Sequence, residues 1–231
     1  MKLRLGIVLC AVLVTTPVVA AEKQELKTQK DKVSYVIGLD MGNSLKKNMV
    51  DVDTEILVRG LKDALSGANP LMTEQEMKET IMALQKDLQA KQQEQAKALA
   101  EKNKKEGESF LAENKKKRGV ITMPSGLQYK ILANGKGQSP KATDTVTVNY
   151  KGTLVDGTEF DSSYKRGQPA TFTVNGVIPG WTEALQLMKE GSKWQLFVPS
   201  NLAYGERGAG GAVGPNAVLI FEVELISIKK Q

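Results

Sequence analysis

The chain has 231 residues, 32 basic and 26 acidic side chains, a formal net charge of +6, one cysteine and no histidine. The lack of histidine excludes a Ser-His-Asp triad and histidine-based zinc motifs, and a single cysteine excludes thiolate zinc sites and internal disulfides. Lysine and glutamate are interspersed and no Walker-type phosphate loop is present, which disfavours nucleic-acid binding and nucleotide chemistry. We therefore expect no metal and no cofactor.

Residues 1–20 have the pattern of a signal peptide. Lys2 and Arg4 precede an apolar run that ends in small residues at Ala20, and the run is too short for a spanning helix. Cleavage there would remove Cys10 and lower the net charge from +6 to +4, because the segment has two basic and no acidic residues. No later apolar run could cross a bilayer, so we expect an exported protein without a transmembrane span.

Residues 21–72 predict a small helical domain. Apolar side chains recur every four positions from Val33 to Leu45, and a second helix is predicted with Asp53 as its N-cap and Gly67 as its stop. These helices bring too little core for a stable monomeric domain. We therefore expect a homodimer through residues 30–90; a small monomeric helical cap is the alternative.

Residues 73–118 predict one long connecting helix. Thr73 and Glu76 form a capping box at its start, and no strong breaker except Gly107 follows before Gly119. About 44 residues at 1.5 Å each would span about 65 Å. Apolar residues gather in the first turns and the later ones are mostly Lys, Gln, Glu, Asn and Ala, so we expect a packed beginning and a solvent-bridging remainder.

Residues 119–231 differ in composition. Ten of the 12 aromatic residues lie between Tyr129 and Phe221. Apolar and polar residues alternate over about five strand-length stretches, Asp156-Gly157 is a hairpin signal, and one short helical pattern, PGWTEALQLMKEG, interrupts them. The pattern predicts an α+β fold, a twisted antiparallel sheet with one short helix packed on it.

The chemistry left open by these exclusions needs no acid, base or nucleophile. Rotation about an X-Pro amide bond is such a reaction, because a site less polar than water favours the twisted form over the strongly dipolar planar amide. Unaided, this rotation takes tens to hundreds of seconds, which is slow enough to limit folding.

Three stretches carry a family resemblance: VNYKGTLVDGTEFDSS, VIPGWTEALQLMKEGSKWQLFVPSNLAYG and LIFEVELISI. Together they resemble the FKBP-type peptidyl-prolyl cis-trans isomerases over about residues 120–230. The first half, with VSYVIGLDMG and the long charged helix, resembles the N-terminal dimerisation region of the Mip (macrophage infectivity potentiator) group of exported bacterial isomerases. The resemblance implies an isomerase of X-Pro bonds that assists folding of exported proteins by stabilising the twisted amide non-covalently in an apolar pocket.

The resemblance also implies site residues. Asp161 and Tyr204 would be the catalytic residues. Asp161, at the pocket edge, would act electrostatically on the twisting bond, and the hydroxyl of Tyr204, with the backbone N–H of Ile178, would bind substrate carbonyls. The other residues that it implies for the pocket are Tyr150, Phe160, Arg166, Val177, Trp181 (the floor), Val213 and Phe221.

Simpler interpretations compete with these roles. An Asp after an aromatic in a hairpin is often only a turn residue, and Trp181 alone would be a core anchor. Phe172 is expected to be core. Ala170 stands where many members of the family carry an aromatic residue and Ala209 where a larger side chain is common, which implies a wider site and altered inhibitor contacts.

The resemblance further implies proline-containing polypeptide clients, a homodimer, and macrolide inhibitors of the FKBP class as candidate ligands. It places the protein in the periplasm, at the outer membrane or at the cell surface of a Gram-negative bacterium. Two other functions stay open, each with catalysis secondary. One is a holdase chaperone that grips unfolded chains, and the other is a surface interaction or virulence protein that uses the basic helix or the Gly-rich loop.

Overall fold

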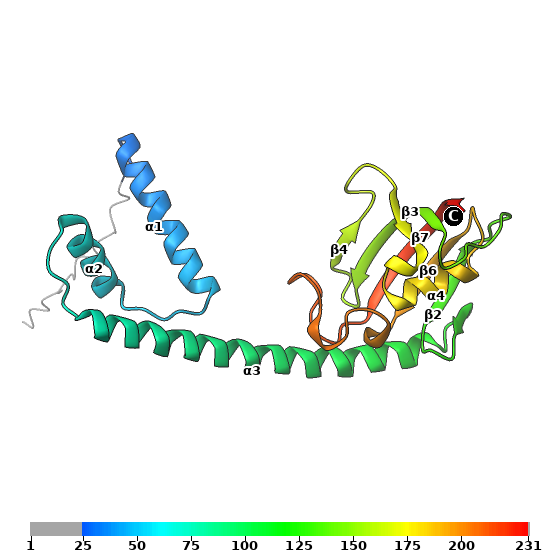
Figure 1. Ribbon diagram of the computed structural model, residues 1–231, viewed down its shortest axis with the longest axis horizontal. Helices are drawn as coiled ribbons and strands as arrows, with labels where there is room; N and C mark the ends of the chain where they lie inside the picture. The colour runs from blue at the N-terminus through cyan, green and yellow to red at the C-terminus, as the bar shows by residue number, and fades with distance from the viewer. Residues whose placement is uncertain (1–24, 231) are drawn as a thin grey trace, which may run out of the picture. The chain divides into compact units, whose positions relative to one another are not determined.

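The computed structural model describes residues 25–230, so the predicted signal peptide and Cys10 lie outside the described residues. The described residues divide into two compact units on either side of the boundary between Met72 and Thr73, and these are coloured blue to cyan and cyan to red in Figure 1. The long helix belongs to the second unit, together with the sheet.

The first unit has two helices, α1 (Gln29–Lys47) and α2 (Thr54–Ser66). The predicted caps of α2 are confirmed: the Asp53 carboxylate accepts hydrogen bonds from two backbone N–H groups of the first turn, and Gly67 ends the helix with a φ of 68°. No described residue of α1 or α2 is buried. Most of the apolar side chains of these two helices are therefore exposed among the described residues.

Helix α3 (Glu74–Asn114) has 41 residues and begins at the predicted capping box, in which the Glu76 N–H donates to Thr73 Oγ1 over 3.2 Å. It ends five residues before Gly119. The expectation that its later part only bridges solvent is wrong for the last turns. Gly107 is buried there, and the ring of Phe110 lies 5.9 Å from that of Phe197 on the sheet.

Seven strands of the described residues form one antiparallel sheet in the order β1-β2-β6-β7-β3-β4, with β5 also paired to β3. Their bounds are β1 Val120–Thr122, β2 Gln128–Ala133, β3 Thr145–Leu154, β4 Glu159–Ser162, β5 Ala170–Thr173, β6 Lys193–Val198 and β7 Leu219–Lys229. The α+β class is confirmed. The sheet has more strands than expected because residues 144–163 fold into a hairpin of two strands and β1 adds a short edge.

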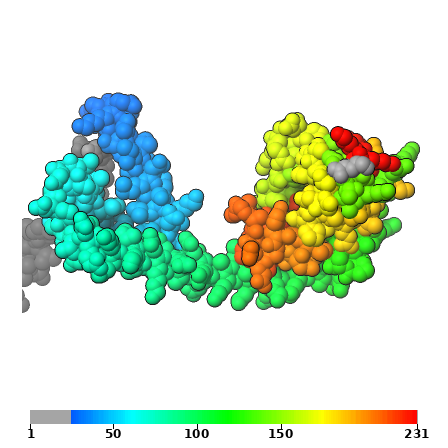
Figure 2. All heavy atoms as spheres, viewed as in Figure 1, coloured from blue at the N-terminus to red at the C-terminus, as the bar shows by residue number. Residues whose placement is uncertain are grey.

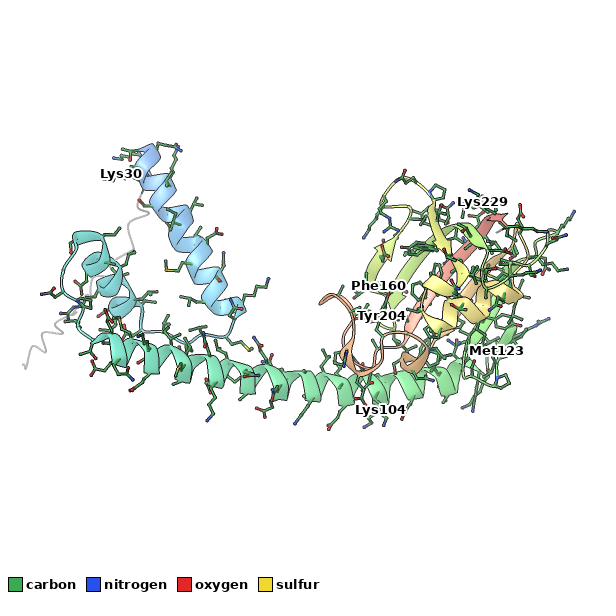
Figure 3. All side chains as sticks on the ribbon, in the orientation of Figure 1. Lys30, Lys104, Met123, Phe160, Tyr204 and Lys229 are labelled. Atoms are coloured by element: carbon green, nitrogen blue, oxygen red, sulfur yellow. The ribbon has the colours of Figure 1, made fainter. Side chains whose placement is uncertain are left out.

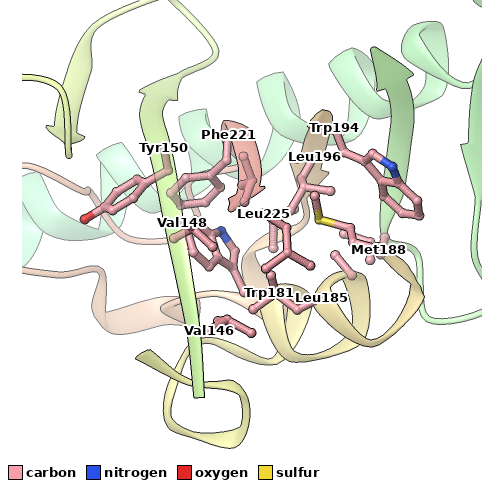
Figure 4. Packing of buried hydrophobic residues seen from close by; sticks show 14 of the residues in the cluster. Val146, Val148, Tyr150, Trp181, Leu185, Met188, Trp194, Leu196, Phe221 and Leu225 are labelled. Carbon is pink, nitrogen blue, oxygen red and sulfur yellow. The ribbon is translucent and has the colours of Figure 1, made fainter. Parts of the chain in front are cut away.

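Helix α4 (Pro179–Leu187) packs on one face of this sheet. Pro179 stands in its first turn, where a missing N–H costs nothing. Alternate residues of β3 are buried, as the period of a strand requires, and they meet Trp181 and Leu185 of the helix (Figure 4). Short 3-10 turns lie at Val174–Gly176, Ser200–Leu202 and Gly205–Arg207.

The last turns of α3 pack closely against Val218, which directly precedes β7, because Gly107 has no side chain. A Cβ at this position would lie 2.6 Å from Cγ2 of Val218. Close by, Asn114 Nδ2 donates to Gln128 Oε1 over 2.9 Å. Across residues 25–230, none of the helices combines the length and apolar character needed to cross a membrane.

Candidate active site

A cavity of about 420 Å³ opens between the start of α4 and the neighbouring strands. Two of its lining residues, Phe160 of β4 and Tyr204, lie at the same end of the sheet (Figure 3). The lining residues are Tyr150, Phe160, Asp161, Phe172, Gly176, Val177, Ile178, Trp181, Tyr204 and Phe221. The structure therefore brings together eight of the ten residues named from the sequence, all except Arg166 and Val213.

Trp181 forms the centre of an aromatic cluster in this cavity and is only 4% exposed. Its ring meets the rings of Tyr150 and Phe221 edge to face, each with centroids 5.2 Å away, and that of Phe172 at 6.0 Å. Edge-to-face packing is one of the geometries that aromatic rings favour. Together these rings form an apolar cup.

Gly152 of β3 makes room for two of these rings. A Cβ there would lie 2.7 Å from Phe160 and 2.9 Å from Phe221, whose rings pack edge to face at 5.6 Å. Sequence reasoning missed Gly152, although a glycine inside a strand pattern signals close approach. It also assigned Phe172 to the core alone, whereas this ring both packs on the core and lines the cavity.

The hairpin register places Asp161 beside the cup. Asp161 pairs with Gly152 across the β3–β4 ladder. The N–H of Ser163 donates to the carbonyl of Tyr150, and the N–H of Tyr150 donates to the Ser163 hydroxyl, each over 2.9 Å. Asp161 Oδ2 accepts a hydrogen bond of 2.5 Å from the Tyr150 hydroxyl. The N–H of Ser162 donates to Oδ1 over 2.8 Å.

Arg166 completes this polar cluster without lining the cavity. Its Nη1 contacts Asp161 Oδ1, and its Nη2 donates to the Tyr150 hydroxyl over 2.6 Å. The guanidinium also lies 5.3 Å from the centre of the Tyr150 ring. Arg166 therefore orients the carboxylate and the phenol at once.

The protonation states follow from these contacts. Burial raises the pKa of Asp161, but the hydrogen bonds from Tyr150 and Arg166 outweigh it, and the pKa lies below its ordinary value. Burial, and then the hydrogen bond to Asp161, raise the pKa of Tyr150. At neutral pH the cluster holds an ionised carboxylate and a protonated phenol, so Asp161 is poorly suited to act as a general base.

Two hydrogen-bond donors at the cavity are available to a ligand. The side chain of Tyr204 is exposed, and within residues 25–230 its hydroxyl makes no hydrogen bond. The backbone N–H of Ile178, just before α4, likewise has no acceptor among the described residues. A polypeptide bound in the cup could place its carbonyl oxygens against both groups.

Val213 lies away from the cavity wall. Its side chain is buried in the hydrophobic core, and its backbone pairs with Ala209 through two hydrogen bonds of 2.8 and 3.0 Å. Ala170 and Ala209 also pack partly buried against the core and do not line the cavity.

We expect the activity of this site to be independent of pH from about pH 5 to about pH 9, and to fall only as the pH drops below the ordinary Asp pKa of about 3.9. The reason is that the pKa of Asp161 is lowered and that of Tyr150 is raised. The lowered pKa also stabilises the fold above the unfolded-state pKa, and this contribution disappears as the pH falls through the folded-state value. Rates measured from about pH 3 to about pH 9 check both parts of this expectation; a bell-shaped pH profile centred near pH 7 would contradict it.

Comparison with known proteins covers nearly the whole described chain. Residues 30–131 match the family described as "Domain amino terminal to FKBP-type peptidyl-prolyl isomerase", and residues 136–226 match "FKBP-type peptidyl-prolyl cis-trans isomerase". "Outer membrane protein MIP" of Legionella longbeachae is 51% identical, covering 94% of this chain and 93% of that protein. "Peptidyl-prolyl cis-trans isomerase Mip" of Coxiella burnetii is 48% identical, covering 89% and 90%.

A solved structure is similar over the same extent. The crystal structure of FkpA from Escherichia coli superimposes with a TM-score of 0.71 at 39% identity, covering 89% of this chain and 99% of that one.

Proposed function

The chain belongs to the family of FKBP-type peptidyl-prolyl cis-trans isomerases, and from this premise we propose that the aromatic cup around Trp181 is its active site. Its activity is to accelerate rotation about X-Pro bonds and so to assist protein folding. The observation that carries the assignment is an apolar cup with an ionised carboxylate and two free donors at its rim.

The cup binds the proline ring of the client. Trp181 forms the floor, and the rings of Tyr150, Phe160 and Phe221 form the walls. Inside, the X-Pro amide leaves water for a less polar surrounding, which penalises the strongly dipolar planar form more than the twisted one. The barrier to rotation falls without any bond to the protein.

Asp161 acts on the electronic change in the amide. When the bond twists, the nitrogen lone pair no longer conjugates with the carbonyl, so the carbonyl carbon becomes more positive. A carboxylate that is already held in place by Tyr150 and Arg166 stabilises this charge without reorganising. The neighbouring ring of Phe160 excludes water and strengthens the interaction.

The hydroxyl of Tyr204 and the N–H of Ile178 orient the client by donating hydrogen bonds to its carbonyl groups. Such contacts are made in both the planar and the twisted state, so they contribute mainly to binding. We expect Tyr204→Phe to raise KM for a short X-Pro peptide by about three- to tenfold with kcat nearly unchanged, because one neutral hydrogen bond is lost. Steady-state kinetics on the full chain check this; an unchanged KM would remove Tyr204 from the binding site.

The first unit forms a homodimer in this proposal. Helices α1 and α2 enclose an apolar groove of about 530 Å³, lined among others by Ile37, Met41, Leu57 and Leu61. Ile37 and Leu61 are 57% and 46% exposed. A second copy of the same helices would cover this surface and supply the core that two short helices lack.

The clients are proline-containing polypeptides, and the protein works after export to the cell envelope. The N-terminal pattern of residues 1–20 and the name of the Legionella longbeachae relative, an outer membrane protein, support this location. Macrolides of the FKBP-inhibitor class would bind in the same aromatic cup.

A further inference from the structure

The loop that follows Tyr204, residues 205–217, is closed on itself by backbone hydrogen bonds. Ala209 and Val213 pair across its middle. At its base, the N–H of Asn216 donates to the carbonyl of Gly205 over 2.8 Å. This last bond ties the end of the loop to the residue directly after Tyr204.

Helix α3 holds this loop from outside. Asn103 Nδ2 donates to the carbonyl of Pro215 over 2.8 Å, and this contact is half-buried. Gly214 lies so close that a Cβ there would be 2.9 Å from Asn103 Nδ2 and 3.2 Å from Leu99 Cδ2. The ribbon and the space-filling view both show the loop, in orange, lying on the green part of the helix (Figure 1, Figure 2).

A second contact between the two is weaker. Asn216 Nδ2 lies 3.5 Å from the carbonyl of Ala100, which is long for a hydrogen bond. The Asn103 contact is therefore the main polar link between the helix and the loop.

The loop needs the contact with Asn103 because its glycine-rich backbone can adopt many conformations. Gly208, Gly210 and Gly211 have φ values of 65°, 58° and 73°, in a region that glycine alone enters without cost. A chain with this freedom loses much conformational entropy when it is ordered. The bond from Asn103 offsets part of that cost at Pro215, next to the residue that pairs with Gly205.

We propose that Asn103 is a positioning residue for the isomerase: through Pro215, Asn216 and Gly205 it holds the Tyr204 hydroxyl at the cavity, so that the connecting helix contributes to substrate binding. The inference rests on the proposed function, because it requires that Tyr204 bind substrate. It gives α3 a role in the reaction beyond connecting the first unit to the sheet.

Asn114 provides a matched control on the same helix. Its side chain also donates one hydrogen bond from α3, to Gln128 Oε1 over 2.9 Å. Gln128, however, lies on β2 and not on the loop. Asn114 is the more buried of the two, at 1% exposure. If Asn103 served only to hold α3 against the rest of its unit, Asn103→Ala and Asn114→Ala would both lower stability and leave KM unchanged.

The test uses steady-state kinetics of the full chain on a short X-Pro peptide. Asn103→Ala is expected to raise KM about three- to tenfold and to change kcat less than about twofold, because a binding donor becomes mobile. Asn103→Asp keeps the shape but replaces the donor with an oxygen, so we expect at least the same rise. Asn114→Ala should lower the unfolding midpoint and leave KM unchanged.

A double-mutant cycle tests whether the effect of Asn103 on KM depends on the Tyr204 hydroxyl. If Asn103 acts through Tyr204, Asn103→Ala adds nothing to the KM of Tyr204→Phe, whereas independent effects would multiply. An unchanged KM in both Asn103 variants, with Tyr204→Phe impaired, overturns the inference and leaves the proposed function intact. An unchanged KM in Tyr204→Phe itself, in a protein that catalyses, overturns both the role of Tyr204 and the inference built on it.

Discussion

Replacing Asp161 with asparagine is expected to lower kcat/KM for an X-Pro peptide by about 100-fold, in the range found when one preorganised electrostatic group is removed from an active site. The substitution keeps the shape of the side chain and removes the charge that we propose faces the twisting amide. Because the side chain is 41% exposed, solvent screens its contacts with Tyr150 and Arg166, and we expect only a small loss of stability. The rate of cis-to-trans conversion of the peptide measures the effect.

Asp156 supplies the control in the same hairpin. Its carboxylate accepts a hydrogen bond from the N–H of Thr158 over 2.9 Å and does not line the cavity. Asp156→Asn should therefore leave the rate unchanged. If Asp161→Asn and Asp156→Asn both left the rate of cis-to-trans conversion unchanged in folded proteins, Asp161 would be only a turn residue, and its electrostatic role would be excluded.

A double substitution in the groove of the first unit, Ile37→Glu with Leu61→Glu, is expected to convert a dimer into a monomer. In a symmetric dimer the four introduced carboxylates would be desolvated among apolar side chains, at a cost that association cannot recover. Sedimentation velocity at micromolar concentration measures the change. Activity on a short peptide should stay at the wild-type level, because the cup lies entirely in the second unit.

Leu65→Glu is the matched control, since Leu65 belongs to α2, is 81% exposed and does not line the groove. This variant should remain dimeric. A wild-type protein that sediments as a monomer would contradict the dimer and would leave the groove open to unfolded clients, as the holdase alternative requires.

Short-range patterns predicted the elements well because their causes lie within a few residues. The Asp53 cap, the Gly67 stop and the capping box of Thr73 and Glu76 are all local hydrogen bonds or local backbone geometry. The alternation along β3 likewise reflects the strand period alone. Such features need no knowledge of the rest of the fold.

Contacts between distant residues could not be predicted in the same way. Asn103 and Pro215 are 112 positions apart, and the helix pattern around Asn103 is indistinguishable from that of a solvated surface. The docking of Gly107 on Val218 was missed for the same reason. In the site, the family resemblance supplied most of the lining residues, but it did not show that Val213 points into the core.

The measurement that tests the account most directly is an NMR exchange experiment on a short X-Pro peptide with the full chain, combined with detection of contacts between the proline ring and the two indoles. Trp194→Phe assigns the signals, because the chain has only two tryptophans. We expect accelerated cis-trans exchange and contacts from the proline ring to Trp181. Accelerated exchange with the proline ring away from Trp181 would place the reaction elsewhere and contradict the assignment of the cup.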